Sequence, residues 1–247
     1  MPLSSNSLIH LTNSLEALEG ILSENFRIKY CKESSNWKNS KTTIYVPMVS
    51  FCDIPLSQIK DHISNYGCYG IGLTKEWAIR NHLNPVLYMQ QNSSLADSYD
   101  QALSSLSNKP AKDDATRRFY HQLSDIVRYT KNYEGTLIRK NAPPRNYRFS
   151  DEREWRYIPS IDEKCEPYYM DSDFDDPKTK EIAAKSVASM RLKFEPNDIK
   201  YLIIKDEIEI TGLINHLRTW IGPNFSMQEV ERLSTRIMTS EQIRTDI

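Results

Sequence analysis

Two glutamates near residue 154 are the residues best placed to carry out chemistry. The segment SDEREWRY (150–157) predicts a β-strand, on which alternate side chains lie on one face. We therefore expect Glu152, Glu154 and Arg156 to point the same way. Two carboxylates on one face can hold a sugar hydroxyl and stabilise an oxocarbenium-like centre. The alternative is a solvent-facing strand whose charges pair across the sheet.

A basic segment, RKNAPPRNYRFS (139–150), comes just before these glutamates. Pro143 and Pro144 predict a loop, because proline is excluded from helix interiors and central strands. The segment carries four cationic side chains that could meet a phosphate, a pyrophosphate or a nucleic acid: Arg139, Lys140, Arg145 and Arg148. The overall net charge of −1 argues against extensive wrapping of nucleic acid by the chain.

A histidine and a cysteine offer two further interpretations. His10 in LIHLTN lies on an expected strand before a helix, where it could hydrogen-bond a ligand hydroxyl, although a lone histidine is more often structural. Cys52 ends an apolar run, and His62 follows ten residues later. A nucleophilic cysteine needs a base or a helix N-terminus to lower its pKa. We favour Cys52 as a small buried side chain.

The segment NYGCYGIGL (65–73) contains three of the seven glycines. It fits neither the phosphate-binding loop of P-loop proteins nor the dinucleotide-binding fingerprint. Instead, the glycines indicate close backbone approach or unusual torsion angles. Tyr66 and Tyr69 would then form an aromatic wall beside this tight passage.

The order of expected elements predicts a single α+β domain over residues 1–247, with a mixed, mainly antiparallel sheet flanked by helices. Strands are expected mainly at 44–90 and 153–205. A helical insertion is expected at about 91–138 and a C-terminal helical segment at about 211–240. Thr74 and the Ser226–Glu229 pair are typical of helix N-termini.

The composition is typical of a globular protein in a reducing cytoplasm. Hydrophobic residues make up 39% and charged residues 26% of the chain. We find no apolar run long enough for a membrane span and no signal-peptide pattern at the N-terminus. The four cysteines form no CxxC pair and no zinc-like spacing with histidine, so we expect no metal site.

Two long blocks resemble the AbiGi family of bacterial abortive-infection proteins: VPMVSFCDIPLSQIKDHISNYGCYGIGLTKEWAIRNHLNPVLY (46–88) and FSDEREWRYIP (149–159). LIHLTNSLEALEGIL and KFEPNDIKYLII fit the same layout, so the resemblance extends over most of residues 8–205. It implies an antitoxin, which restrains a nucleotidyltransferase-like toxin encoded beside it by binding the toxin or limiting its expression.

A weaker similarity connects the H-x-T and E-x-E segments to the ADP-ribosyltransferase layout, including DarT-like toxins. It implies NAD as a cofactor and glycosyl transfer to a protein or nucleic acid. In this interpretation the catalytic residues are Glu154, Glu152 and His10. The residues that would bind NAD are His10, Thr12, Tyr66, Tyr69, Arg145 and Arg148.

Overall fold

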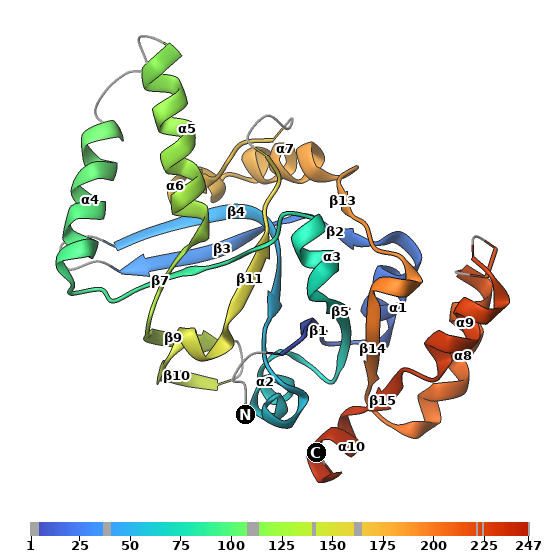
Figure 1. Ribbon diagram of the computed structural model, residues 1–247. Coiled ribbons are helices and arrows are strands. Elements are labelled where there is room, and N and C mark those ends of the chain that lie inside the picture. Colours follow the sequence, from blue (N-terminus) through green and yellow to red (C-terminus); the bar gives the residue numbers. More distant parts are fainter. Residues whose placement is uncertain are drawn as a thin grey trace. The chain divides into compact units, whose positions relative to one another are not determined.

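The computed structural model describes residues 5–36, 41–107, 114–139, 142–160, 165–220, 222–223 and 225–246 (Figure 1). Its contacts divide the chain into two compact units, each built from separate stretches of sequence. The first unit comprises Met1–Arg27, Val49–Asn84 and Met190–Ile247, and the second comprises Ile28–Met48 and Pro85–Ser189. The organisation of residues 1–247 as a single domain stays a prediction.

The first unit contains a sheet with the strand order β15-β14-β5-β1-β4. Its strands are β1 (Ser7–Thr12), β4 (Lys41–Cys52), β5 (Tyr69–Thr74), β14 (Ile199–Ile204) and β15 (Ile237–Thr239). Only the last four residues of β4 belong to this unit, and there Ile9 faces Cys52. Strands β14 and β15 are parallel, whereas β1 and β14 both pair antiparallel with β5. A separate short pair joins β2 (Phe26–Arg27) to β13 (Arg191–Leu192).

In the described part of the first unit, six α-helices accompany the strands. They are α1 (Leu15–Glu24), α2 (Lys60–Tyr66), α3 (Lys75–Arg80), α8 (Ile210–Trp220), α9 (Met227–Ser234) and α10 (Ser240–Asp246). Thr74 caps α3 by accepting from the Trp77 N–H, and Ser226 with Glu229 forms a capping box at α9, as predicted. The Trp77 side chain is fully buried and packs against the rings of Phe26 and Phe51.

Two glycines of the glycine-rich segment lie unusually close to atoms of other segments, as the sequence predicts. Gly67 adopts φ +122°, and a Cβ there would lie 2.1 Å from the Thr12 carbonyl oxygen. A Cβ at Gly72 would lie 2.1 Å from the ring of Tyr201. Both positions therefore require glycine.

The second unit contains the remainder of β4, Lys41–Met48, which pairs antiparallel with β3 (Lys29–Asn36) and with β12 (Tyr169–Met170). Its other strands are β7 (Leu87–Met89), β8 (Thr130–Asn132), β9 (Gly135–Arg139), β10 (Ala142–Tyr147) and β11 (Glu154–Tyr157). Its helices are α4 (Ser94–Ser107), α5 (Asp114–Tyr129), α6 (Asp171–Phe174) and α7 (Pro177–Val187). The two-residue strand β6 (Asn84–Pro85) crosses the boundary between the units.

The predicted α+β class with a mixed, mainly antiparallel sheet is confirmed. Helices α4 and α5 occupy most of the expected helical insertion, but strands follow from Thr130 onward. Within the described ranges, no helix has both the length and the apolar character needed to cross a membrane.

The loop predicted at 139–150 is wrong over most of its length. Strands β9 and β10 form an antiparallel hairpin there, with Pro143 and Pro144 inside β10. The register shifts between Ala142 and Arg145, so the prolines lie at an irregularity in a two-stranded edge. Proline is tolerated at such bulges because a regular ladder hydrogen bond is not required.

Candidate functional site

The glutamates of the E-x-E segment lie in a buried group of charges within the second unit. Glu154 and Arg156 occupy alternate positions of β11 and are 6% and 0% exposed, so their predicted common face is confirmed. Glu152 is not on the strand, which corrects that part of the prediction. It ends the short 3₁₀-helix Phe149–Glu152, and Arg153 at φ 44° interrupts the extended backbone between the two glutamates.

Lys131 brings the two carboxylates together despite this interruption. Its Nζ lies 2.9 Å from Glu152 Oε2 and 2.7 Å from Glu154 Oε2. On the other side of Glu154, Arg156 Nε lies 2.7 Å from Oε1, and Arg156 Nη2 lies 2.9 Å from Glu33 Oε2. We refer to these five residues, Glu33, Lys131, Glu152, Glu154 and Arg156, as the ion-pair cluster.

Neighbouring polar groups fix the position of the ion-pair cluster. Arg156 Nη1 donates to the main-chain carbonyl of Arg128 at 2.7 Å, next to the last residue of α5. A cation is favourable there because the carbonyl groups at a helix C-terminus carry partial negative charge. The Glu154 N–H donates to the Tyr88 hydroxyl at 2.8 Å. Lys131 Nζ lies 5.2 Å from the centroid of the Phe149 ring.

The cluster keeps Glu154 ionised. Burial alone would raise the pKa of Glu154, but the Arg156 guanidinium and the Lys131 ammonium outweigh it and lower this pKa from 4.5 to about 2. Burial likewise opposes the charge of Lys131, yet Glu154 and Glu33 raise the Lys131 pKa well above 10.5. At neutral pH Glu154 is therefore a carboxylate held by two cations, and it carries no proton to donate.

Three residues predicted to bind NAD, His10, Tyr66 and Tyr69, lie in the first unit. His10 Nδ1 shares a hydrogen bond with the Ser50 carbonyl at 2.8 Å, and its ring centroid lies 5.2 Å from that of Phe26. Tyr66 stacks on His62, and Tyr69 donates to Glu209 Oε1 at 2.7 Å. These contacts account for His10 and the two tyrosines as packed members of their own unit.

Cys52 and His62 fit the packing interpretation favoured above. The Cys52 thiol donates to the Ile9 carbonyl at 3.4 Å, within the core that also contains Ile59 and Ile63. His62 is 7% exposed, with its ring centroid 5.9 Å from that of Tyr66.

The basic residues of the predicted loop lie on the β9–β10 hairpin and the turn that follows it. Arg145 and Arg148 are exposed, and their guanidinium carbons lie 5.6 Å and 5.9 Å from the rings of Tyr147 and Tyr133. Lys140 and the side chain of Arg139 lie outside what the structure describes.

The structure thus brings Glu152 and Glu154 together in the second unit, which also contains Arg145 and Arg148. It places His10, Thr12, Tyr66 and Tyr69 in the first unit. A common NAD site, and the catalytic roles of Glu154, Glu152 and His10, stay predictions. Sequence reasoning missed Lys131 and Glu33, which lie 23 and 121 residues from Glu154 and share no local pattern with it. Among the described residues, no three His, Cys, Asp or Glu side chains are grouped so that they could hold a metal ion.

Comparison with known proteins identifies the family of this chain. Residues 24–205, more than half of the chain, match the family model "Putative abortive phage resistance protein AbiGi, antitoxin". The abortive phage resistance protein AbiGi of Lactococcus lactis subsp. cremoris is 28% identical over 221 residues, covering 82% of this chain and 89% of that protein. No solved structure matches the chain. These comparisons give no support to the resemblance to ADP-ribosyltransferases. Because of the extent of the family match, the chain belongs to the AbiGi family of abortive phage resistance proteins.

Proposed function

We propose that this protein is the antitoxin of an abortive-infection system and restrains a cognate toxin by binding it. The observation that carries this proposal is the family match over residues 24–205. The matched range contains every segment of the second unit, including the ion-pair cluster. The proposed partner is the nucleotidyltransferase-like toxin that the resemblance implies, encoded by the neighbouring gene.

The electrostatics of the ion-pair cluster support a binding protein in preference to an enzyme that uses Glu154. Lys131 and Arg156 occupy both oxygens of the Glu154 carboxylate. A carboxylate already neutralised in this way stabilises a developing positive charge less than a free one does. The cluster instead connects β3, β8 and β11 of the second unit through buried ion pairs.

Co-expression with the neighbouring gene tests the proposal. We expect this chain to relieve the growth arrest caused by that gene product and to co-purify with it. A frameshifted copy of this chain is the control for effects of expression alone. If growth arrest persists and the two proteins do not co-purify, the antitoxin role is excluded.

The exposed cations of the β9–β10 region favour a second candidate, in which the protein limits toxin expression by binding nucleic acid. Arg145 and Arg148 each lie beside a tyrosine ring, an arrangement that suits phosphates and stacked bases. Two phosphate contacts predict that log K falls with log salt with a slope of about −1.8 for duplex DNA. The test measures binding to duplex DNA of the toxin promoter at several salt concentrations. An affinity independent of salt, or unchanged in an Arg145→Gln/Arg148→Gln variant, would exclude this mode.

A further inference from the structure

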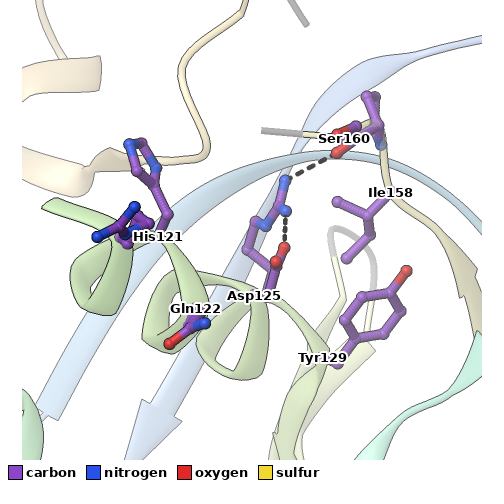
Figure 2. Close-up of a pocket in the computed structure, with 9 residues that line it drawn as sticks. His121, Gln122, Asp125, Tyr129, Ile158 and Ser160 are labelled. Carbon is purple, nitrogen blue, oxygen red and sulfur yellow. Dashed lines mark hydrogen bonds and ion pairs between the residues drawn. The ribbon is translucent and has the colours of Figure 1, made fainter. Parts of the chain in front are cut away.

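A cavity of about 320 Å³ lies beside α5 in the second unit and contributes to no function described above. Its wall combines side chains of α5 with the segment Ile158–Ser160, which follows β11 (Figure 2). Figure 2 shows Gln122 and Asp125 on the helix, with Tyr129 and Ile158 side by side. The volume lies at the lower end of the roughly 300–1,000 Å³ typical of small-molecule sites.

The charged lining of the cavity is cationic. Arg118 and Arg128 contribute two positive charges, and Asp125 contributes one negative charge. The Asp125 carboxylate pairs with Arg128 Nη2, so it is already occupied. These three side chains together carry a net charge of +1, which favours an anionic ligand.

Arg128 is the most informative of these residues because it is only 2% exposed. Its Nη1 donates to the Pro159 carbonyl at 3.0 Å, and its Nη2 pairs with Asp125. Its Nε is buried and has no hydrogen-bond partner within the described chain. A buried donor without an acceptor is costly, so Arg128 has a hydrogen-bonding requirement that the described chain does not meet.

The rest of the wall is mixed: His121, Gln122 and Ser160 are polar, and the other three residues are largely apolar. Tyr129, Ile158 and Pro159 form this apolar part of the lining. Burial raises the pKa of the Tyr129 phenol, so Tyr129 stays uncharged and adds no second anion to the site. The lining therefore offers an arginine-rich contact for one anionic group and a surface for an uncharged body.

We propose that this cavity binds a small organic anion, in which a phosphate or carboxylate group contacts Arg118 and Arg128 and an apolar or aromatic body packs on Tyr129 and Ile158. Arginine suits such groups because its planar guanidinium presents several donors in a fixed geometry. The cavity is argued from its own lining and does not require the proposed function to be correct.

Amide NMR titration of the full chain tests the proposal with three probes of the same size class: phenyl phosphate, benzoate and uncharged phenol. We expect phenyl phosphate or benzoate to shift the signals of Gln122, Tyr129 and Ser160, and phenol to leave them in place. Whichever anion binds more tightly identifies the phosphate or the carboxylate as the preferred group.

Two variants and one control locate the contact. Arg118→Gln changes an exposed side chain and should raise the dissociation constant about threefold, the effect of losing one solvent-accessible ion pair. Arg128→Lys keeps the charge but loses the planar guanidinium donors, so it should raise the dissociation constant more than Arg118→Gln does. Arg218→Gln changes an exposed arginine of α8 in the first unit and should have no effect.

Three results would overturn the inference. The first is that neither anion binds at concentrations on the order of 10 mM. The second is that phenol shifts the NMR signals as much as the anions do. The third is that Arg118→Gln and Arg218→Gln change the dissociation constant by the same factor. If Arg128→Lys fails to fold, the comparison of Arg118→Gln with Arg218→Gln still decides the question.

Discussion

Replacement of Glu154 by glutamine removes the charge that connects the two cations of the ion-pair cluster while nearly preserving side-chain size. The fall of the Glu154 pKa from 4.5 to about 2 corresponds to about 3 kcal/mol of interaction with the ionised form. Breaking a buried ion pair from one side costs roughly 3–5 kcal/mol. Lys131 keeps Glu152 and Arg156 keeps Glu33 after the change, so the lower value is expected.

The dependence on pH gives this prediction a second signature. Because the folded-state pKa of Glu154 is lowered, its contribution to stability is fully present above the unfolded pKa near 4.5. This contribution is lost as the pH falls through the folded value of about 2. The difference in unfolding free energy between wild type and Glu154→Gln should therefore be about 3 kcal/mol at pH 7 and shrink steadily below about pH 4.5.

Urea unfolding followed by circular dichroism measures both quantities. The matched control is Glu181→Gln, which breaks an exposed pair with Lys185 on α7 and should cost less than about 0.5 kcal/mol at any pH. The electrostatic reasoning is refuted if Glu154→Gln unfolds within about 0.5 kcal/mol of wild type at pH 7. It is also refuted if the difference stays constant as the pH is lowered.

Three further changes test local features of the structure. Gly67→Ala should lower the unfolding free energy by about 3 kcal/mol, because Gly67 has a positive φ and the added Cβ would clash with Thr12. In Gly20→Ala, within α1, the added Cβ meets no atom within 4 Å, and the unfolding free energy should rise by about 0.5–1 kcal/mol. Equal effects of the two substitutions in urea melts would contradict these roles of the glycines. Burial raises the pKa of Cys31 to about 11, so at pH 8 iodoacetamide should alkylate it about 100-fold more slowly than free cysteine, as followed by peptide mass spectrometry. A rate like that of free cysteine would contradict the raised pKa of Cys31. Trp77→Phe loses a 2.9 Å hydrogen bond from the indole Nε1 to a main-chain carbonyl and should cost about 1–2 kcal/mol in the same melts, and an unchanged midpoint would count against the bond.

Short-range patterns predicted much of the local structure correctly. The alternation of Glu154 and Arg156, the caps at Thr74 and Ser226, and the crowding of Gly67 each depend on residues a few positions apart. Such patterns reflect backbone geometry that neighbouring residues determine among themselves, so the sequence contains them directly.

The errors arose where the fold overrides a local preference. Arg153 takes a left-handed conformation, which removes Glu152 from the strand, and arginine has no intrinsic preference that would indicate this. Pro143 and Pro144 lie in β10 because a register shift accommodates them. The pairing of Glu154 with Lys131 depends on how β8 and β11 are brought together, and no periodicity in the sequence encodes that.

The ion-pair cluster changes the meaning of the E-x-E segment. Three carboxylates and two cations from separate parts of the second unit pair with one another, and each cation pairs with two carboxylates, so loss of a cation leaves buried carboxylates poorly compensated. Arg156 belongs to this cluster and also binds the carbonyl of Arg128, the residue whose guanidinium lines the cavity beside α5. Glu154 pairs with Arg156, and Arg156 donates to a carbonyl near the end of the helix that carries Arg118, Asp125 and Arg128. In the ligand complex that we propose, the side chains of α5 contact the ligand, and Glu154 helps to position α5 through Arg156.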